Sequence, residues 1–363
     1  MTKVILENLT KVYPGGTKAL DHLNIEIESG SFTSLLGPSG CGKTTTLKLI
    51  AGLLEPTEGR IFFDDEDVTY LPPQKRGVGL VFQDYAVFSH MTGFENIAFG
   101  LKIKGVDKQE IKRRVNEIAS LLEIEHVLSK KPREMNISEL QRVSLARTIV
   151  TRPRVLLLDE PLSNLDATLR VRARIELKKL QKHLKQTIIY VTHDQVEALT
   201  LSDKVAVMSQ GKLMQYDTPE NIFNKPRNKF VAGFVGTPPM NFIDCTLVRR
   251  GDHLLLDAGS FQLDVTPIRN ILGNVKSSEL VLGIRPRDVI IQREVDAKDA
   301  LTGEVLAIEP QGVENVVAIK IGEIIIKAIV PGDLIIKDLQ KIRFKFDLHK
   351  IHIFDKKSEE AYL

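Results

Sequence analysis

Residues 37–44 match the pattern G-x-x-x-x-G-K-S/T of a phosphate-binding loop; in order they are Gly37, Pro38, Ser39, Gly40, Cys41, Gly42, Lys43 and Thr44. The glycines allow successive backbone N–H groups to point inward at a polyphosphate. Lys43 supplies a positive charge for the terminal phosphates, and Thr44 offers a hydroxyl to Mg²⁺. The apolar run 32–36 before the loop and the helical pattern 45–53 after it favour a nucleotide site over a simple glycine-rich turn.

Two adjacent carboxylates, Asp159 and Glu160, follow the apolar run 155–158. At the carboxyl end of a strand, Asp159 can hold Mg²⁺ directly or through water. Because adjacent strand residues face opposite sides, we expect Glu160 to point toward the nucleotide and to orient or deprotonate the attacking water. The alternative is an exposed Asp-Glu turn, which the nearby phosphate loop makes less favourable.

Strand-like and helical patterns alternate over residues 1–235, and this predicts an α/β domain. Several of the apolar runs are rich in Val, Ile and Leu, as expected for strands buried on both faces: 32–36, 78–82, 155–158, 187–191 and 204–208. Between about 95 and 140 the pattern becomes helical and charged, with Ile111, Val115 and Ile118 on one face. We interpret this segment as a helical insertion in the α/β domain.

Many short strand-like runs separated by Gly, Pro and Asp follow residue 235. They predict a separate all-β domain over 236–363, an OB-like barrel. An RNA-binding barrel is the alternative, but the chain has no Trp and no interleaved basic and aromatic residues. We therefore favour a structural or regulatory barrel.

Composition limits the classes of function. The formal charge of the 363-residue chain is +3, too small to indicate nucleic acid as the main ligand. No apolar stretch reaches the roughly 20 residues of a membrane helix, and the first residues do not resemble a signal peptide. A disulfide at Cys41 would obstruct the phosphate loop, so we expect a reducing cytosol.

Several further motifs make the chain resemble an ATP-binding subunit of an ABC transporter. They include the phosphate loop, Leu158-Asp159-Glu160-Pro161, Ser163-Asn164-Leu165-Asp166 and Thr192-His193-Asp194. Gln83 with 85–92, His193 to Ala198, 236–242 and Gly283-Ile284-Arg285-Pro286 resemble the carbohydrate importer ATPases that serve maltose, other oligosaccharides and glycerol 3-phosphate. The resemblance extends over almost the whole chain.

The resemblance implies a role for each matching residue. Tyr13 would stack on adenine, and Thr45 would join residues 37–44 in binding ATP. Gln83 would reach both Mg²⁺ and the attacking water, with Thr44 and Asp159 as the other metal neighbours. His193 would contact the γ-phosphate and hold Glu160 and its water in place. Asp166 would reach across a dimer interface, or cap the helix that starts at Ala167, and both can hold.

One motif departs from the family. Such ATPases form head-to-tail dimers in which a Leu-Ser-Gly-Gly-Gln segment of one subunit faces the other subunit's ATP. Gapless alignment puts residues 135–139, here called the signature segment, in that place: Met135, Asn136, Ile137, Ser138 and Glu139. A register through Ile137 and Ser138 keeps a serine but breaks the match on both sides. In either register both glycines are lost and a carboxylate is added, which obstructs the γ-phosphate.

The resemblance therefore implies an ATP-hydrolysing importer subunit for a sugar or polyol phosphate, peripheral on the cytoplasmic face of the membrane. Its partners would be transmembrane permease subunits, indirectly an extracellular solute-binding protein, and a second ATPase subunit. Because of the signature segment we prefer a different ATPase over a second copy of this chain. One alternative is a regulatory subunit with negligible turnover. Another, a soluble ATPase of repair or translation, predicts a coiled coil or a second cassette, and neither is present.

Overall fold

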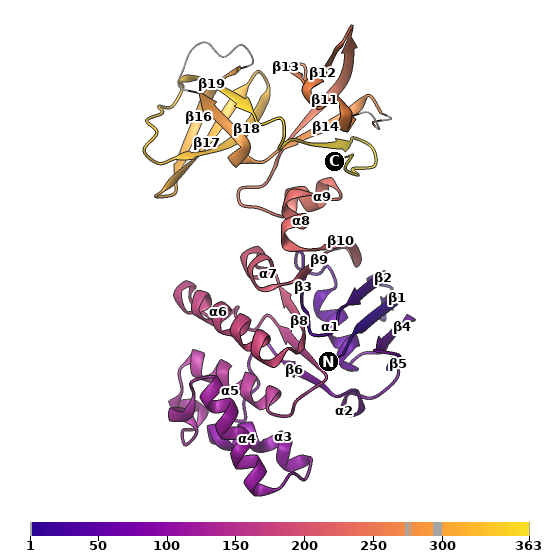
Figure 1. Ribbon diagram of the computed structural model, residues 1–363, viewed down its shortest axis with the longest axis vertical. Helices are drawn as coiled ribbons and strands as arrows, with labels where there is room; N and C mark the ends of the chain where they lie inside the picture. The colour runs from indigo at the N-terminus through magenta and orange to yellow at the C-terminus, as the bar shows by residue number, and fades with distance from the viewer. Residues whose placement is uncertain (1, 273–274, 276, 293–299, 363) are drawn as a thin grey trace. The chain divides into compact units, whose positions relative to one another are not determined.

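The computed structural model describes residues 2–272, 275, 277–292 and 300–362. The chain divides into two compact units, Met1–Pro219 and Glu220–Leu363, and each is described by itself (Figure 1). Among the described residues, no helix is both long and apolar enough to cross a bilayer.

A six-stranded sheet organises the first unit, in the order β10-β9-β3-β8-β7-β6, with only β10 antiparallel to its neighbour. The apolar runs of the sequence supply it, because β3, β8 and most of β7 are buried along their length. The bounds are β3 Phe32–Leu36, β6 Val78–Val81, β7 Val155–Asp159, β8 Thr187–Thr192, β9 Lys204–Ser209 and β10 Lys212–Asp217.

The two faces of this sheet belong to different cores, as the period of two along a strand requires. Leu156 and Leu158 of β7 pack with the helices of the insertion, whereas Val155 and Leu157 pack with α1 and a second sheet. That second sheet is antiparallel, in the order β2-β1-β4-β5. The bounds are β1 Val4–Val12, β2 Lys18–Ile27, β4 Glu58–Phe63, β5 Glu66–Asp67 and α1 Lys43–Ala51.

The segment predicted as a helical insertion, about 95–140, contains α4, most of α3 and only the start of α5; the three helices lie together in Figure 1. In α4 the buried residues Ile111, Val115 and Ile118 recur at helical spacing, and Asp107 caps the first turn. The bounds of the remaining helices in this unit are α2 Pro73–Arg76, α3 Gly93–Ile103, α4 Lys108–Leu121, α5 Ile137–Ile149, α6 Ala167–Leu184 and α7 Gln195–Leu201.

The second unit is dominated by two five-stranded antiparallel sheets that share one apolar core. The sheets are β13-β12-β11-β14-β20 and β15-β19-β16-β17-β18, so the prediction of an all-β region is confirmed. The strands are β11 Asn241–Arg250, β12 His253–Asp257, β13 Gln262–Asp264, β14 Glu279–Ile284, β15 Val289–Gln292, β16 Leu301–Pro310, β17 Glu314–Ile321, β18 Ile324–Pro331, β19 Lys341–Phe346 and β20 His352–Asp355. Helix α10 is Arg269–Leu272.

The helices α8, Pro219–Asn224, and α9, Lys229–Phe234, precede the boundary at 235/236 that the sequence suggests, yet they fall almost wholly in the second unit. Ala232 of α9 packs with Met240, Val281 and Phe354, and Arg285 donates hydrogen bonds to the carbonyls of Phe223 and Val235. The segment that holds α8 and α9 is therefore part of the β-rich unit, because its apolar side chains pack there and its carbonyl groups accept hydrogen bonds there.

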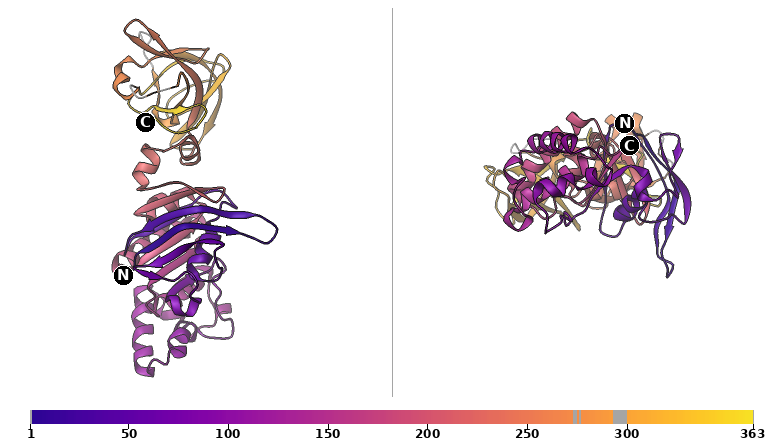
Figure 2. Two further views of the ribbon diagram at one scale, coloured as in Figure 1. Left: turned by 90° about the vertical axis from the view of Figure 1, so that its right-hand side faces the viewer. Right: turned by 90° about the horizontal axis from the view of Figure 1, so that it is seen from below.

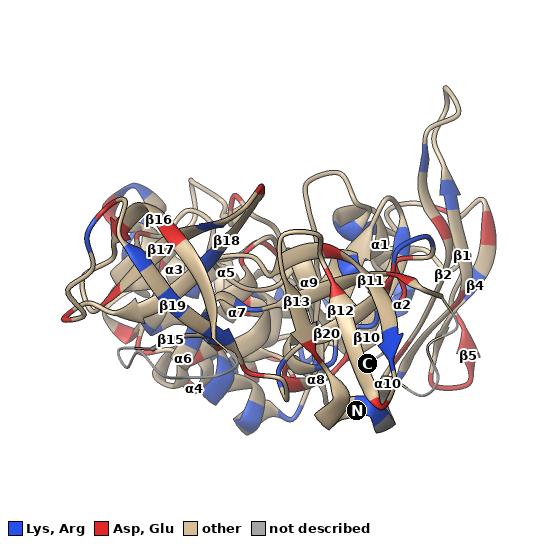
Figure 3. Ribbon diagram, turned by 90° about the horizontal axis from the view of Figure 1, so that it is seen from above, with Lys and Arg blue, Asp and Glu red and all other residues tan. Residues whose placement is uncertain are grey.

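The chain has nearly equal numbers of positive and negative side chains, and it has two cysteines. Figure 3 shows Lys and Arg interspersed with Asp and Glu in the view from above. Cys41 and Cys245 are both free thiols and both buried.

Candidate functional site

The phosphate loop connects β3 to α1. Gly40 and Gly42 adopt φ of 77° and 108°, a region that favours glycine, and a Cβ on Gly42 would come within 2.6 Å of the Ala19 carbonyl oxygen. The buried Lys43 ammonium donates to the carbonyl oxygens of Gly37 at 2.8 Å and Pro38 at 3.0 Å. The Lys43 ammonium is therefore held within the loop, where it can bind an anion at the start of α1.

The expected metal neighbours Thr44 and Asp159 lie together. The Thr44 hydroxyl donates to Asp159 Oδ1 across 3.3 Å. Two oxygen ligands at right angles on an Mg²⁺ ion, each about 2.1 Å from it, would be about 3.0 Å apart, so this pair fits the ion. Burial raises the pKa of Asp159, the Thr44 hydrogen bond opposes that rise, and the charge of Glu160 adds to it.

Glu160 and His193 form the second pair. His193 Nδ1 lies 3.2 Å from Glu160 Oε2, and both residues follow the carboxyl ends of adjacent parallel strands, β7 and β8. The expectation that Glu160 alternates with Asp159 along the strand is wrong, because β7 ends at Asp159. Glu160 instead has φ of 46°, and its N–H bonds the Val191 carbonyl. A tight turn, not strand alternation, separates the two carboxylates.

A buried polar cluster supports the end of β8. Glu197 of α7 accepts hydrogen bonds of 2.7 Å from both Tyr190 and Thr192, and Arg170 lies 3.8 Å from its other oxygen. Burial raises the pKa of Glu197. The cluster fixes the backbone that immediately precedes His193.

Tyr13 lies in the turn of the β1–β2 hairpin, which projects from the first unit in the left panel of Figure 2. Its hydroxyl lies 3.3 Å from the Thr45 hydroxyl at the start of α1, and the Lys11 ammonium lies 5.7 Å from its ring. The ring is thus next to the phosphate loop, where a base attached to bound phosphates would lie.

Gln83 follows the carboxyl end of β6, so it shares the sheet edge with the phosphate loop, Glu160 and His193. Its side chain is exposed, and its carbonyl accepts a 3.0 Å hydrogen bond from Asn164. The next residues are held by α5: Ser144 and Arg147 donate to the carbonyls of Tyr85 and Ala86 at 2.7 Å each. Arg147 also lies 5.1 Å above the Phe88 ring.

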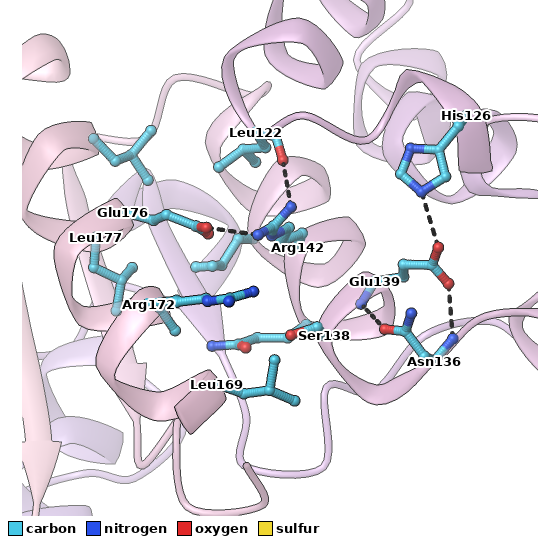
Figure 4. Close-up of a pocket in the computed structure, with 14 residues that line it drawn as sticks. Leu122, His126, Asn136, Ser138, Glu139, Arg142, Leu169, Arg172, Glu176 and Leu177 are labelled. Carbon is cyan, nitrogen blue, oxygen red and sulfur yellow. Dashed lines mark hydrogen bonds and ion pairs between the residues drawn. The ribbon is translucent and has the colours of Figure 1, made fainter. Parts of the chain in front are cut away.

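Asp166 and the signature segment occupy helix starts. Asp166 Oδ1 accepts from the N–H groups of Thr168 and Leu169, both at 3.0 Å, so the expected cap of α6 is confirmed. Asn136 caps α5: its Oδ1 accepts from the Glu139 N–H at 2.9 Å, and Glu139 Oε2 accepts from the Asn136 N–H at 2.8 Å (Figure 4). No hydrogen bond or ion pair between described residues joins Asn136, Ser138 or Asp166 to the phosphate loop.

The Glu139 carboxylate is fixed at the start of α5. His126 Nε2 lies 2.9 Å and Lys130 Nζ 3.8 Å from Glu139 Oε1. Burial raises the pKa of Glu139, but the Asn136 N–H, His126 and Lys130 outweigh it and hold the pKa below its ordinary value. An ionised carboxylate thus occupies the positive end of the helix.

Sequence reasoning assigned no role to several residues that position the site. Glu197, Tyr190 and Thr192 brace His193, while Ser144 and Arg147 anchor the segment after Gln83. Their partners are distant in sequence or are backbone carbonyls, so no spacing in the chain signals these contacts.

Comparisons with known proteins agree with this geometry. A family model described as ABC transporter matches residues 20–163, and one described as MalK OB fold domain matches residues 236–289, which confirms the OB-like prediction. The trehalose/maltose import ATP-binding protein of Thermococcus litoralis is 44% identical over 374 residues, covering 99% of this chain and 100% of that protein. The sn-glycerol-3-phosphate import ATP-binding protein of Psychromonas ingrahamii is 45% identical over 291 residues, 80% of this chain and 76% of that protein.

Among solved structures, cbiO1 of Clostridium perfringens, part of an ABC transporter complex, is 32% identical with a TM-score of 0.58. The match covers 61% of this chain and 90% of that chain.

Proposed function

The chain belongs to the ATP-binding subunits of ABC-type importers and is an ATPase, and from this premise we propose that it uses Mg²⁺ and ATP to drive uptake of a sugar or polyol phosphate. The observation that carries the proposal is the meeting of two pairs, Thr44 with Asp159 and Glu160 with His193, at one edge of the parallel sheet. The similar proteins named above import trehalose and maltose or sn-glycerol 3-phosphate.

The residues divide the chemistry between them. Lys43 and the N–H groups of the phosphate loop bind the β- and γ-phosphates, and Tyr13 stacks on the base. Glu160 accepts the proton of the attacking water, and His193 orients Glu160 and binds the γ-phosphate. Thr44, Gln83 and Asp159 would hold Mg²⁺, which neutralises charge on the phosphate oxygens.

The chain would work as half of an ATPase dimer at the cytoplasmic face of the membrane, beneath permease subunits, with an extracellular solute-binding protein delivering the cargo. ATP binding closes the dimer and hydrolysis reopens it, which drives alternating access in the permease.

We test the transport assignment in cells that lack this chain. Uptake of radiolabelled trehalose, maltose and glycerol 3-phosphate should fall for at least one of the three, and the wild-type chain but not Glu160→Gln should restore it. Unchanged uptake of all three would reject this substrate class. ATP hydrolysis by the purified protein is measured in parallel, so that loss of the transport claim does not count against the ATPase.

The second ATPase subunit of the dimer is proposed to be a different chain with an intact signature. The support is Glu139: its carboxylate stands at the start of α5, where family members present glycine N–H groups to the other subunit's γ-phosphate. The Glu139 carboxylate and the γ-phosphate would repel each other there, and the half-exposed Ile137 side chain would obstruct the approach of the phosphate. A homodimer would therefore contain two impaired sites, and a mixed dimer one.

Turnover of this chain alone decides between the two assemblies. The purified protein, verified as a homodimer at saturating ATP and Mg²⁺, should hydrolyse ATP about 10² to 10³ times more slowly than a mixed dimer, the scale of a lost donor to developing charge. Robust hydrolysis by the homodimer would refute the mixed assembly. In the mixed dimer, Glu160→Gln in this chain should damage turnover far more than the matching change in its partner.

A further inference from the structure

The second unit contains a cavity of about 740 Å³ whose lining residues all lie within residues 223–352. This volume falls in the range of roughly 300–1,000 Å³ typical of small-molecule sites. Among the described residues that line it, four are Lys or Arg and one is acidic: Lys225, Arg285, Arg287, Lys350 and Asp288. His349 and His352 also line the wall, and the Lys and Arg side chains favour an anion in the cavity. We call it the cationic pocket.

Arg285 is the buried cation of the cationic pocket. Only 5% of it is exposed, yet no ion pair to Arg285 occurs among the described residues. Nη1 donates to the Val235 carbonyl at 2.7 Å and Nη2 to the Phe223 carbonyl at 2.5 Å, while Nε has no hydrogen-bond partner. Burial lowers the pKa of Arg285 to about 10, and nearby Asp288 only partly opposes this. The two carbonyl dipoles and the Phe223 ring, whose centroid lies 3.7 Å from the guanidinium carbon, compensate part of this buried charge, and an anion would supply the missing counter-charge.

Holding the ends of α8 and α9 in place would explain the two carbonyl bonds of Arg285, but not the cations around it. Lys350 and Arg287 are exposed at the same cavity, and Arg287 lies 3.0 Å from Glu314, outside the cavity lining. Burial raises the pKa of Asp288, and the charge of Lys350 opposes that rise. With Arg287 paired to Glu314, the charges of Arg285 and Lys350 still exceed that of Asp288, the one carboxylate among the described lining residues.

The rest of the lining is suited to an organic body. Phe223, Ile329 and Ile351 provide apolar surface, and the Thr237 hydroxyl and Asn224 amide lie in the same wall. Inorganic phosphate would leave most of the cavity empty. We propose that the cationic pocket binds a small organic phosphate, a single phosphate ester on a body of hexose size, separately from the ATP site.

Calorimetry on the full chain tests this with glucose 6-phosphate, at saturating ADP so that the phosphate loop is already occupied. We expect saturable binding that Lys350→Gln weakens about tenfold, the scale of one charge-assisted hydrogen bond to phosphate. Lys357→Gln is the matched control, because Lys357 is exposed in the same unit and does not line the cavity. This variant should bind glucose 6-phosphate as tightly as the wild type does. Thermal unfolding of both variants verifies that each is folded.

Each remaining outcome counts against the proposal. No saturable binding at millimolar glucose 6-phosphate would overturn it, and so would equal weakening by Lys357→Gln, which indicates unspecific attraction. Glucose binding as tightly would show that the phosphate is not recognised. Inorganic phosphate binding as tightly as glucose 6-phosphate would show that the organic body is not recognised.

Discussion

At the scale of single residues, the site consists of close pairs contributed by segments far apart in the chain. Thr44 meets Asp159, Glu160 meets His193, and Tyr13 meets Thr45. Each pair combines an oxygen or nitrogen that can bind a ligand with a neighbour that fixes its direction. Two substitutions separate binding from chemistry.

Lys43→Ala should weaken ATP binding and abolish measurable turnover, because the ammonium is buried and its charge is poorly screened there. Nucleotide affinity is measured by calorimetry and turnover by phosphate release. Lys108→Ala, an exposed lysine at the start of α4, is the control and should behave as wild type. Unchanged affinity in Lys43→Ala would remove the loop from the site.

Glu160→Gln should keep ATP binding and lower the hydrolysis rate by about 10² or more, the usual scale for a missing general base. The amide preserves the shape of the side chain, so binding isolates the loss of proton transfer. The matched control is Glu58→Gln on the exposed face of β4. A rate equal to that of the parent would assign the base to another residue.

At the scale of elements, α5 connects two functional segments. It begins at the signature segment, and its Ser144 and Arg147 hold the carbonyls of Tyr85 and Ala86, just after Gln83. Tyr85 and Ala86 both have left-handed φ, 61° and 45°, so this loop conformation depends on its anchors. A helix of 13 residues is about 20 Å long, so one regular element joins the signature segment to this loop.

Arg147→Gln should reduce turnover about tenfold while leaving ATP affinity within about twofold, because it removes a charge-assisted bond that shapes the loop but does not touch the phosphates. Separate measurement of kcat and nucleotide affinity checks this. The exposed Arg133→Gln serves as control. A parallel loss of affinity would mean that the loop contributes to nucleotide binding itself.

Replacing Asn136, Ile137 and Ser138 by Ser, Gly and Gly, with Glu139→Gln, should raise the turnover of the homodimer by about 10²-fold or more, the lower end of the scale for a restored donor. The change also removes the carboxylate from the helix start. Glu134→Gln, in the turn before α5, controls for lost negative charge alone. If the rate does not rise, the signature segment is not what limits the homodimer.

The sequence predicted the elements with uninterrupted apolar runs best. The run 32–36 matches β3, and 187–191 and 204–208 match β8 and β9 within one residue. Strands buried on both faces consist almost entirely of apolar residues, so their runs are easy to recognise in the sequence. It missed β4 and β10, whose exposed residues interrupt the pattern. The positions of Glu160 and of the Arg147 anchor could not be predicted, since both depend on backbone geometry set by distant residues.

At the scale of the whole molecule, every nucleotide motif lies in the first unit, and α8 and α9 satisfy their buried groups in the second. A chain ending at Pro219 should therefore bind ATP within about threefold of the full chain, as domains carry their own cores. A chain ending at Phe234 should bind ATP too but aggregate more readily, because Val231 and Ala232 lose their cover. Calorimetry and light scattering compare them; a folded Pro219 chain that does not bind ATP would contradict the two-unit arrangement.

The left-handed backbone conformation of Glu160 lowers the stability of the fold at a residue that the proposed hydrolysis requires. A side chain at φ 46° costs roughly 1–2 kcal/mol, and glycine would avoid that cost at roughly 0.5–1 kcal/mol in lost chain entropy. Glycine would also remove a charge that disfavours ionised Asp159, while the partly exposed contact with His193 contributes little. Glu160→Gly should therefore melt at a slightly higher temperature than the wild type while hydrolysing no ATP, and a lower melting temperature would contradict this trade. The strain at Glu160 is therefore a cost in stability that the chain bears at the residue proposed to activate the attacking water.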